Sequence, residues 1–252
     1  MENLYLVIIF SLIGGVLSLV GGVFLLTRKK SAKLTGAATA LAAGALLAAA
    51  FMDLIPEAVS KGDPHLVPLM ILVGVLVFFI LESSLHWFHH HSSHNTHKHD
   101  QTDPVVPLIV IGDTLHNAID GIAIAAGFLI DPLSGIIITL AVAAHEIPQE
   151  IGDFGLLLHK GLKKSKVLII NALSALATTV SAVVFFLLGS SFEINLSPLL
   201  ALIAGFFIYI ALSDIIPGIH AEKKQKVLHS IILLAGVAFV GALIFTFQHF
   251  FE

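Results

Sequence analysis

The 252-residue sequence has no cysteine and little charge. Without cysteine, neither a disulfide framework nor thiolate ligation of a metal is available. Charged residues make up 12% of the chain, about half the share found in a soluble globular domain, whereas 57% of the residues are hydrophobic and the mean hydropathy is +0.97. We therefore expect a protein that resides in a lipid bilayer and has no nucleic-acid partner.

Apolar stretches of membrane-spanning length recur along the whole chain. A hydrocarbon core about 30 Å thick requires about 20 apolar residues per helix. The stretches that meet this length are residues 4–26, 34–60, 66–88, 105–130, 132–158, 167–190, 197–219 and 227–250. We predict an all-α integral membrane protein with eight transmembrane helices, which form a single domain over residues 1–252.

Basic residues gather on one side of the predicted helices. Twelve of the 13 lie in the first, third, fifth and seventh connections, and only Lys61 lies on the other side. Short cytoplasmic loops are enriched in lysine and arginine. We therefore predict a plasma (inner) membrane protein with both termini extracytoplasmic. The first stretch is expected to remain as a helix, because Glu2 and no basic residue precedes it.

The third connection, residues 89–103, is rich in histidine and is predicted to be cytoplasmic. Its histidines are His89, His90, His91, His94, His97 and His99. Short histidine-rich tracts suggest metal binding, while a solvated loop or a tag without this role is the alternative. No fixed ligand geometry is visible in the spacing, so any binding here is expected to be weak and exchangeable.

A short motif occurs twice, near the ends of the second and seventh stretches. The sequence reads Asp-Leu-Ile-Pro from Asp53 and Asp-Ile-Ile-Pro from Asp214. The predicted topology makes these two helices run in opposite directions, so the motifs lie near opposite membrane faces. This pattern is typical of an inverted repeat, here helices 1–3 and 6–8 around helices 4 and 5. The alternative is that proline commonly ends helices.

Two polar stripes lie inside the otherwise apolar fourth and fifth stretches. They consist of Asp113, His116, Asn117 and Asp120, and of His145, Glu146, Gln149, Glu150 and Asp153. Spacings of three and four residues place each set on one helical face. Leaving one ionised carboxylate at the bilayer centre costs about 3 kcal/mol, so we expect the stripes to face a partner, water or an ion.

The two stripes are expected to meet. His116 lies 15 residues before Asp131 and His145 lies 14 residues after it. At about 1.5 Å per residue, both histidines are about 21–22 Å below the same turn. Imidazole, carboxylate and carboxamide ligands suit Zn²⁺, and also Fe²⁺, Mn²⁺, Co²⁺, Ni²⁺ or Cd²⁺. The sequence therefore predicts a divalent-metal site inside the membrane.

Two enzymatic readings are excluded by the motifs. An intramembrane zinc protease requires His-Glu-x-x-His, whereas residues 145–149 read His-Glu-Ile-Pro-Gln. The second histidine is missing, and Pro148 is expected to bend the helix that must present both ligands. The chain also has no P-loop pattern. We therefore expect a protein that is not an enzyme.

These motifs resemble the ZIP (Zrt-/Irt-like protein) family of divalent-cation transporters. Residues 116–121 (HNAIDG) are similar to that family's HN-x-x-(D/E)-G. Residues 145–153 (HEIPQEIGD) are similar to the HEIPHE-x-GD of its histidine-rich-loop branch. Residues 171–176 and 53–57 also resemble that branch. The likeness covers all eight stretches.

The resemblance implies a homodimer that imports metal into the cytosol by alternating access. It implies one metal site at His116, Asp120, His145 and Gln149, and an adjacent one at Asn117, Asp120, Glu146 and Gln149 or Glu150. Gln149 stands where the branch has histidine, which weakens one ligand. Asn171 and Ser174 stand where some members have a carboxylate. The second site is therefore expected to be weak or absent.

The expected substrate is Zn²⁺ or a related ion such as Fe²⁺, Mn²⁺ or Cd²⁺. The ion is expected to enter past Asp53, and past Asp113 if the fourth helix presents that residue outward, and to leave past Asp153, Asp214 and the loop histidines. Two alternatives remain at this point. One is a metal-binding membrane sensor, and the other is a passive divalent-metal channel.

Overall fold

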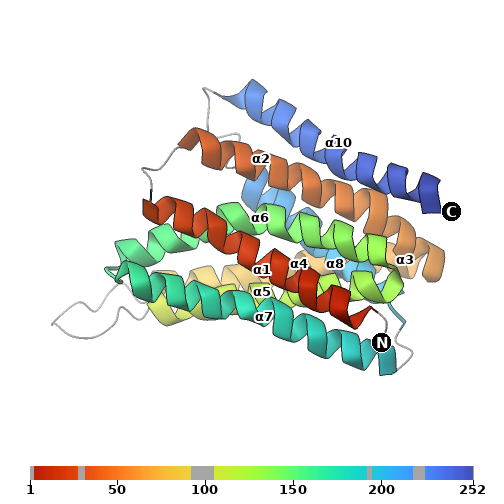
Figure 1. The fold of residues 1–252 in the computed structure, drawn as a ribbon, viewed down its shortest axis with the longest axis horizontal. Helices are drawn as coiled ribbons and strands as arrows, with labels where there is room; N and C mark the ends of the chain where they lie inside the picture. The colour runs from red at the N-terminus through yellow and green to blue at the C-terminus, as the bar shows by residue number, and fades with distance from the viewer. Residues whose placement is uncertain (1–2, 28–31, 92–104, 192–194, 218–224, 252) are drawn as a thin grey trace.

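The chain folds into a bundle of long helices (Figure 1). The computed structural model describes residues 3–27, 32–91, 105–191, 195–217 and 225–251. The elements are α1 (Leu4–Thr27), α2 (Ala32–Ala49), η1 (Ala50–Leu54), α3 (Ile55–Lys61), α4 (Leu66–His91), α5 (Val105–Ile130), α6 (Pro132–His159), α7 (Lys164–Ser191), α8 (Ser197–Tyr209), η3 (Ile210–Ile215) and α10 (Lys226–Phe251). The predicted all-α membrane fold is confirmed.

Within the described ranges, four helical segments are both long enough and apolar enough to cross a membrane. They are Gly36–Lys61, Ile109–Ile130, Lys164–Ser191 and Lys226–Thr246. Shorter apolar helices occupy Leu4–Leu17, Leu66–Leu81 and Ser197–Ser213. Helix α6 is 28 residues long, but its polar stripe lowers its hydropathy. Each described helix overlaps one of the eight predicted stretches, and the count of eight membrane spans stays a prediction.

The helices pack in pairs that are related by the predicted repeat. Helix α1 packs against α6 and α5 packs against α7, while α2 packs against α10 and α4 against α8. The predicted repeat exchanges spans 1–3 with spans 6–8, and span 4 with span 5. This exchange converts the α1–α6 pair into the α7–α5 pair, and the α2–α10 pair into the α8–α4 pair. The packing therefore agrees with an inverted repeat.

Glycines allow close helix approach in two of these related pairs. A methyl group at Gly44 or Gly236 would overlap a backbone carbonyl across the α2–α10 interface. The same overlap would occur at Gly74 and Gly205 across the α4–α8 interface. Small residues at such contacts are common in membrane proteins, because backbones can then pack directly against each other.

The repeated Asp-x-Ile-Pro motif coincides with two breaks in regular α-helix. The segments η1 and η3 are π-helical, and they contain Asp53 and Asp214, respectively. The prolines that follow, Pro56 and Pro217, have no N–H to donate to the preceding turn, which removes a regular helix bond. Such π-turns are frequent at functional sites, and their matching positions further agree with the repeat.

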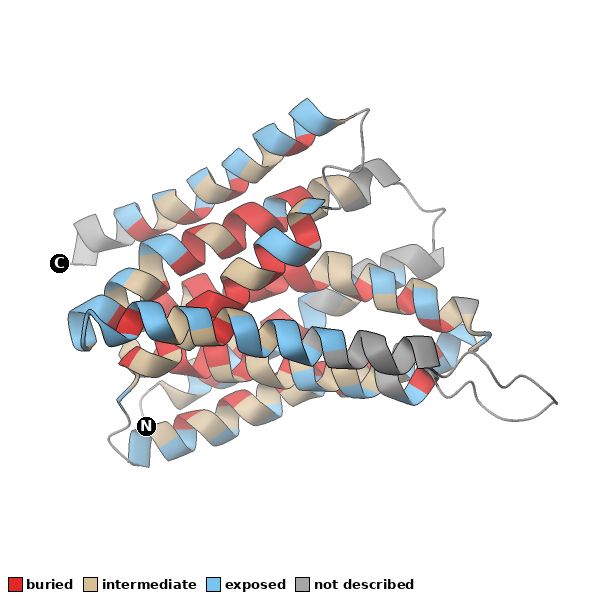
Figure 2. Ribbon diagram, turned by 180° about the vertical axis from the view of Figure 1, so that it is seen from behind, coloured by how far each residue is buried: buried red, intermediate tan, exposed pale blue. Residues whose placement is uncertain are grey.

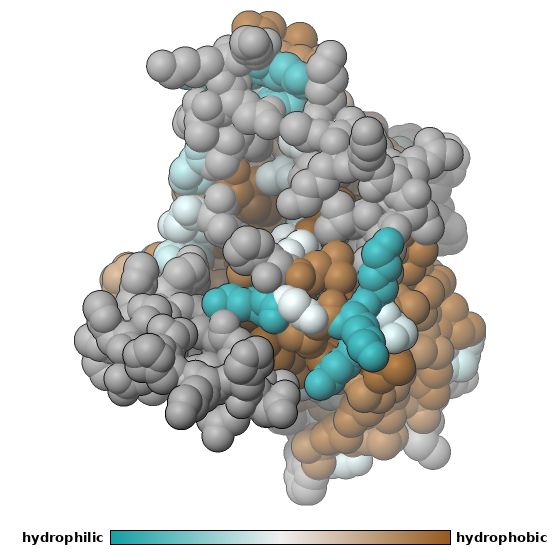
Figure 3. All heavy atoms as spheres, turned by 90° about the vertical axis from the view of Figure 1, so that its left-hand side faces the viewer, coloured by the Kyte–Doolittle hydropathy of each residue, from teal (hydrophilic) through white to brown (hydrophobic). Residues whose placement is uncertain are grey.

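The two chain termini lie at one end of the bundle, and the connection between α6 and α7 lies at the other (Figure 1). Figure 3 views this second end, where hydrophilic side chains stand against an apolar body. Lys163, Lys164 and Lys166 are exposed there, around the connection between α6 and α7. The fold thus separates the termini from this cluster of lysines, as the predicted topology requires.

The outward surface of the bundle is largely apolar. Burial is concentrated where helices face each other, and the outer helix faces are exposed (Figure 2). On α10, Val227 is 76% exposed, Phe239 57% and Phe245 72%. Large apolar side chains on the outer face of a helix suit contact with lipid, because lipid tails, unlike water, do not favour burying them inside the protein.

Candidate metal centre

A capped turn joins the two helices that carry the polar stripes. The Asp131 carboxylate accepts hydrogen bonds from the backbone N–H groups of Leu133 at 2.8 Å and Ser134 at 3.0 Å. Pro132 stands in the first turn of α6, where its missing N–H removes no helix bond. The short turn lets α5 and α6 pack together over their length.

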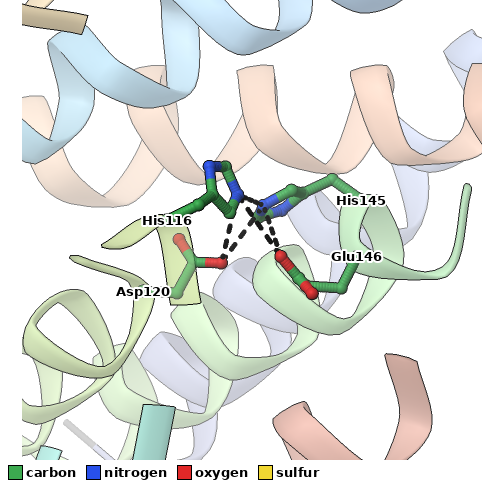
Figure 4. Close-up of side chains that lie close together, drawn as sticks. All are labelled: His116, Asp120, His145 and Glu146. Carbon is green, nitrogen blue, oxygen red and sulfur yellow. Dashed lines mark hydrogen bonds and ion pairs between the residues drawn. The ribbon is translucent and has the colours of Figure 1, made fainter. Parts of the chain in front are cut away.

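The predicted meeting of the two histidines is confirmed. The His116 Nε2 atom on α5 lies 3.2 Å from the His145 Nε2 atom on α6. Asp120 and Glu146 join them, and one ligand atom from each of the four residues lies within 4.8 Å of the others. Figure 4 shows these side chains converging from the two helices. Two imidazoles and two carboxylates thus form one cluster, called the metal centre below.

The separations within the metal centre match the edges of a small tetrahedron. Asp120 Oδ2 lies 3.2 Å from His145 Nε2 and 3.7 Å from His116 Nε2. Glu146 Oε1 lies 3.3 Å from His116 Nε2 and 3.8 Å from His145 Nε2. With zinc–ligand bonds of about 2.0–2.1 Å, a regular tetrahedron has edges of about 3.3–3.4 Å. Five of the six separations are therefore close to those around one tetrahedral ion, and the sixth, between Asp120 and Glu146, is at most 4.8 Å.

A backbone carbonyl fixes the ring of His145. The ring nitrogen Nδ1 lies 3.0 Å from the Ala141 carbonyl oxygen, one turn earlier on α6. Since a carbonyl only accepts, Nδ1 must carry the proton in this bond. In the neutral ring the Nε2 lone pair then points into the metal centre. Metal-binding histidines are commonly oriented by such a bond.

The carboxylates of the metal centre are buried and lack hydrogen-bond donors. Asp120 is 2% exposed and Glu146 is 1% exposed. Asp120 Oδ2 and both carboxylate oxygens of Glu146 have no hydrogen-bond partner. A buried carboxylate without donors is costly unless a cation or proton neutralises it. The donor set and these oxygens therefore fit a divalent cation as cargo.

Aromatic rings from the α4–α8 pair cover the histidines. Phe78 of α4 meets the His116 ring edge-on, with centroids 5.7 Å apart. Phe207 of α8 lies 6.3 Å from the His145 ring. These contacts shield the metal centre on one side, where the His116 side chain is 12% exposed. Excluding water in this way strengthens electrostatic attraction for a cation.

Asn117 is bonded away from the metal centre. Its Nδ2 atom donates to Asp113 Oδ1 at 2.9 Å and to the Asp113 backbone carbonyl at 3.1 Å. Its Oδ1 atom accepts from the Thr178 hydroxyl of α7 at 2.8 Å. Asn117 and Thr178 are both buried. The predicted ligand Asn117 therefore stands in an interhelical hydrogen-bond network.

The other polar residues of α6 continue from the metal centre toward the basic end. Gln149 is half-buried one turn beyond His145. Glu150 is 1% exposed, and neither of its carboxylate oxygens has a hydrogen-bond partner. The pathway roles of Asp113 and Asp153 stay predictions.

A second polar contact lies at the end of the bundle near the termini. The Ser134 hydroxyl lies 3.2 Å from Asp53 Oδ1 and 2.9 Å from Asp131 Oδ2. Asp53 Oδ2 is buried and has no hydrogen-bond partner. The contact places the predicted pathway residue Asp53 beside the start of α6, 81 positions further along the chain.

Several predicted residues lie outside what the structure describes. The backbone of Asp214 is part of η3, but its side chain is not described. The same holds for His89, His90 and His91 at the end of α4, whereas His94, His97 and His99 fall in residues 92–104, which lie outside the described ranges. Their metal-binding roles stay predictions.

The sequence patterns did not single out Ser134, Thr178, Phe78 or Phe207. For Thr178 a signal exists, because hydroxyl residues recur on α7 at spacings of three and four residues. The phenylalanines had no such signal, since the chain has 18 of them in apolar surroundings. Only the packing of distant helices distinguishes those beside the metal centre.

Comparison with known proteins agrees with this geometry. A family model described as ZIP zinc transporter matches residues 3–107 and 101–244. The zinc transporter ZIP4 of Mus musculus is 37% identical over 134 residues, which are 51% of this chain and 20% of that protein. The metal cation symporter ZIP8 of Homo sapiens is 37% identical over 120 residues, which are 48% of this chain and 26% of that protein.

A third relative gives a similar picture. The metal cation symporter ZIP14 of Xenopus tropicalis is 38% identical over 118 residues, covering 47% of this chain and 25% of that protein. The chain thus matches about a quarter or less of the length of these curated relatives. The family match, by contrast, extends over nearly all of the chain, from residue 3 to residue 244. This chain belongs to the ZIP zinc transporter family.

Proposed function

We propose that this protein carries Zn²⁺, or a related divalent metal such as Fe²⁺, Mn²⁺ or Cd²⁺, across the membrane into the cytosol. The observation that carries the proposal is the metal centre, where His116, Asp120, His145 and Glu146 converge within 4.8 Å. Two imidazole nitrogens and two carboxylate oxygens in a tetrahedral arrangement suit Zn²⁺. The set contains no thiolate, the ligand that is common in structural zinc sites.

Charge balance supports a divalent cargo. Two neutral imidazoles and the two carboxylates of Asp120 and Glu146 carry a formal charge of −2. One divalent cation makes the metal centre neutral, which removes the main electrostatic cost of placing it inside a membrane. A monovalent or trivalent ion leaves a net charge there.

The proposed route runs between the two ends of the bundle. Asp53 stands on the outer side, and Asp113, Gln149, Glu150 and Asp153 stand between the metal centre and the basic end. On the inner side, the route continues past Asp214 and the loop histidines of residues 89–103. The cluster of lysines at this end supports a cytosolic assignment and therefore outward-facing termini in the plasma membrane.

Transport is favoured over sensing or a passive channel by the inverted packing and by the names of the relatives. Inverted repeats are typical of transporters that open alternately to each side. ZIP4 is named a zinc transporter, and ZIP8 and ZIP14 are named metal cation symporters. A homodimer and membership of the histidine-rich-loop branch belong to the same proposal and rest on the sequence resemblance.

Flux into proteoliposomes that contain a metal-sensitive dye tests the proposal. The purified full chain should give saturable Zn²⁺ uptake, and the His145→Ala/Asp120→Ala variant should give none while keeping its helical content. His65→Ala is the matched control, because this exposed histidine lies in the connection between α3 and α4. Binding without flux would favour the sensor, and flux that does not saturate would favour the channel.

A further inference from the structure

We infer that Ser134 is a gating residue, whose hydroxyl closes the outer end of the proposed transport route by joining two helices. This gate rests on the proposed function, because it assigns one step of that transport to a single side chain. Ser134 lies in the first turn of α6, and Asp53 lies in η1, the π-helical break that follows α2. The contact between them therefore ties a metal-bearing helix to the helix that carries the first copy of the repeated motif.

The Ser134 hydroxyl stands between two carboxylates. Its Oγ atom lies 2.9 Å from Asp131 Oδ2 and 3.2 Å from Asp53 Oδ1. Because a hydroxyl carries a single proton, it can donate to only one of the two at a time. Asp131 also accepts two backbone N–H groups, whereas the second oxygen of Asp53 is buried and has no hydrogen-bond partner. The link to Asp53 is thus the longer one, and it depends on this one hydroxyl.

The inverted repeat supplies an internal comparison for this contact. It relates α2 and η1 to α8 and η3, and it relates α6 to α5. Helix α2 packs extensively against α6, and η1 contacts α6 as well. Helix α8 makes only slight contact with α5, and within the described residues η3 has no comparable packing against α5. The α2–α6 interface, which ends at Asp53 and Ser134, is therefore closed, while its α8–α5 counterpart is open.

A divalent cation can release the contact without breaking the cap of α6. Carboxylate oxygens bind Zn²⁺ directly, and the unpartnered Oδ2 atom of Asp53 is such an oxygen. The charge of a divalent ion attracts a carboxylate more strongly than a hydroxyl dipole does. When Asp53 turns to an arriving ion, the Ser134 hydroxyl keeps its shorter bond to Asp131, so only the link between η1 and α6 is lost. The outer end therefore opens in response to the substrate.

The lack of cysteine in the chain allows the gate to be followed with a single reporter. Ala141 lies seven residues after Ser134, on the same face of α6, and is fully buried. In intact cells that express the full chain, a membrane-impermeant maleimide applied outside should label Ala141→Cys slowly, because the outer end is closed. Labelling requires no transport, so it tests the gate even if the proposed zinc uptake fails.

Removing the hydroxyl should open the outer end. Ser134→Ala leaves two carboxylates facing each other without the shared proton, and loss of one hydrogen bond to a charged group shifts an equilibrium on the order of tenfold. We therefore expect Ala141→Cys to be labelled on the order of tenfold faster. Ser134→Thr keeps a hydroxyl and should retain the slow labelling. An unchanged rate in Ser134→Ala would overturn the inference and leave the proposed zinc uptake untouched.

Ser197→Ala is the matched control for a fold that is merely loosened. Ser197 is also buried at this end of the bundle, and its hydroxyl donates to the Ala58 carbonyl at 2.8 Å, which joins α8 to α3. Its loss should lower the melting temperature by a similar amount but leave the labelling of Ala141→Cys slow. If Ser197→Ala sped labelling as much as Ser134→Ala, general loosening would explain both, and the inference would fail.

Asp53→Asn gives a second test, which also serves if Ser134→Ala does not fold. An amide at position 53 has the shape of the carboxylate but can donate an N–H to Ser134 Oγ, so that the serine proton is left for Asp131. The contact then has a donor for each link, and Ala141→Cys should be labelled no faster than in the parent. Faster labelling would show that the contact does not hold the outer end closed, and would overturn the inference.

Discussion

The cap on α6 offers a quantitative test of how the metal-bearing helices are held. In Asp131→Ala, the backbone N–H groups of Leu133 and Ser134 lose an acceptor at 2.8 and 3.0 Å, and the Ser134 hydroxyl loses one at 2.9 Å. Loss of an N-cap costs about 1 kcal/mol and at most about 2. A negative charge at a helix N-terminus adds about 0.3–1 kcal/mol. We expect a total loss of about 2 kcal/mol, or about 30-fold in the folding equilibrium.

Reversible unfolding in mixed detergent micelles, followed by circular dichroism, measures this loss. Asp131→Asn keeps one oxygen acceptor for the backbone and should lose about half as much. Asp63→Ala is the control, because Asp63 accepts a backbone N–H at 2.9 Å but is exposed in a loop, and it should change stability by less than about 0.5 kcal/mol. If Asp131→Ala were as stable as the parent, the turn would not depend on its cap.

Three further predictions concern packing and metal binding. Gly74→Ala should destabilise the fold by about 1–3 kcal/mol, because the added methyl group overlaps a carbonyl of α8. Gly152→Ala should not destabilise it, because no atom lies within 4 Å of the added methyl group. The melting temperatures of the two variants test this difference. Gln149→His should raise Zn²⁺ affinity on the order of tenfold in chelator competition, because an imidazole at this implied ligand position binds Zn²⁺ more strongly than a carboxamide; unchanged affinity would place position 149 outside the coordination sphere. Zn²⁺ at about 100 times its dissociation constant should stabilise the folded protein by about 2.7 kcal/mol, and removal by chelator, or the His145→Ala/Asp120→Ala change, should abolish this gain.

The chemistry of the metal centre was accessible from the sequence because it depends on local periodicity. Spacings of three and four residues placed polar side chains on one face of each helix, and nearly equal distances along the chain from Asp131 brought His116 and His145 to about the same depth. The observed contact of 3.2 Å between their rings follows from that arithmetic and a short turn. The inverted repeat was also indicated by the sequence, because the Asp-x-Ile-Pro motif recurs in two helices that are predicted to run in opposite directions.

What the sequence did not reveal depends on contacts between helices distant along the chain. The bond between Asn117 and Thr178 joins residues 61 positions apart, and that between Asp53 and Ser134 joins residues 81 positions apart. Hydroxyl and amide groups have many partners available in a helical bundle, so their sequence spacing does not select one.

The formal charge of the metal centre has a consequence for membrane voltage. A centre loaded with one divalent ion is neutral, so its passage across the bilayer gains nothing from the membrane potential. An empty centre that returns with Asp120 and Glu146 ionised moves two negative charges, worth about 4.6 kcal/mol across 100 mV if they cross the whole field. An empty centre that returns with two protons moves none. The voltage dependence of the return step therefore reports how many protons travel back.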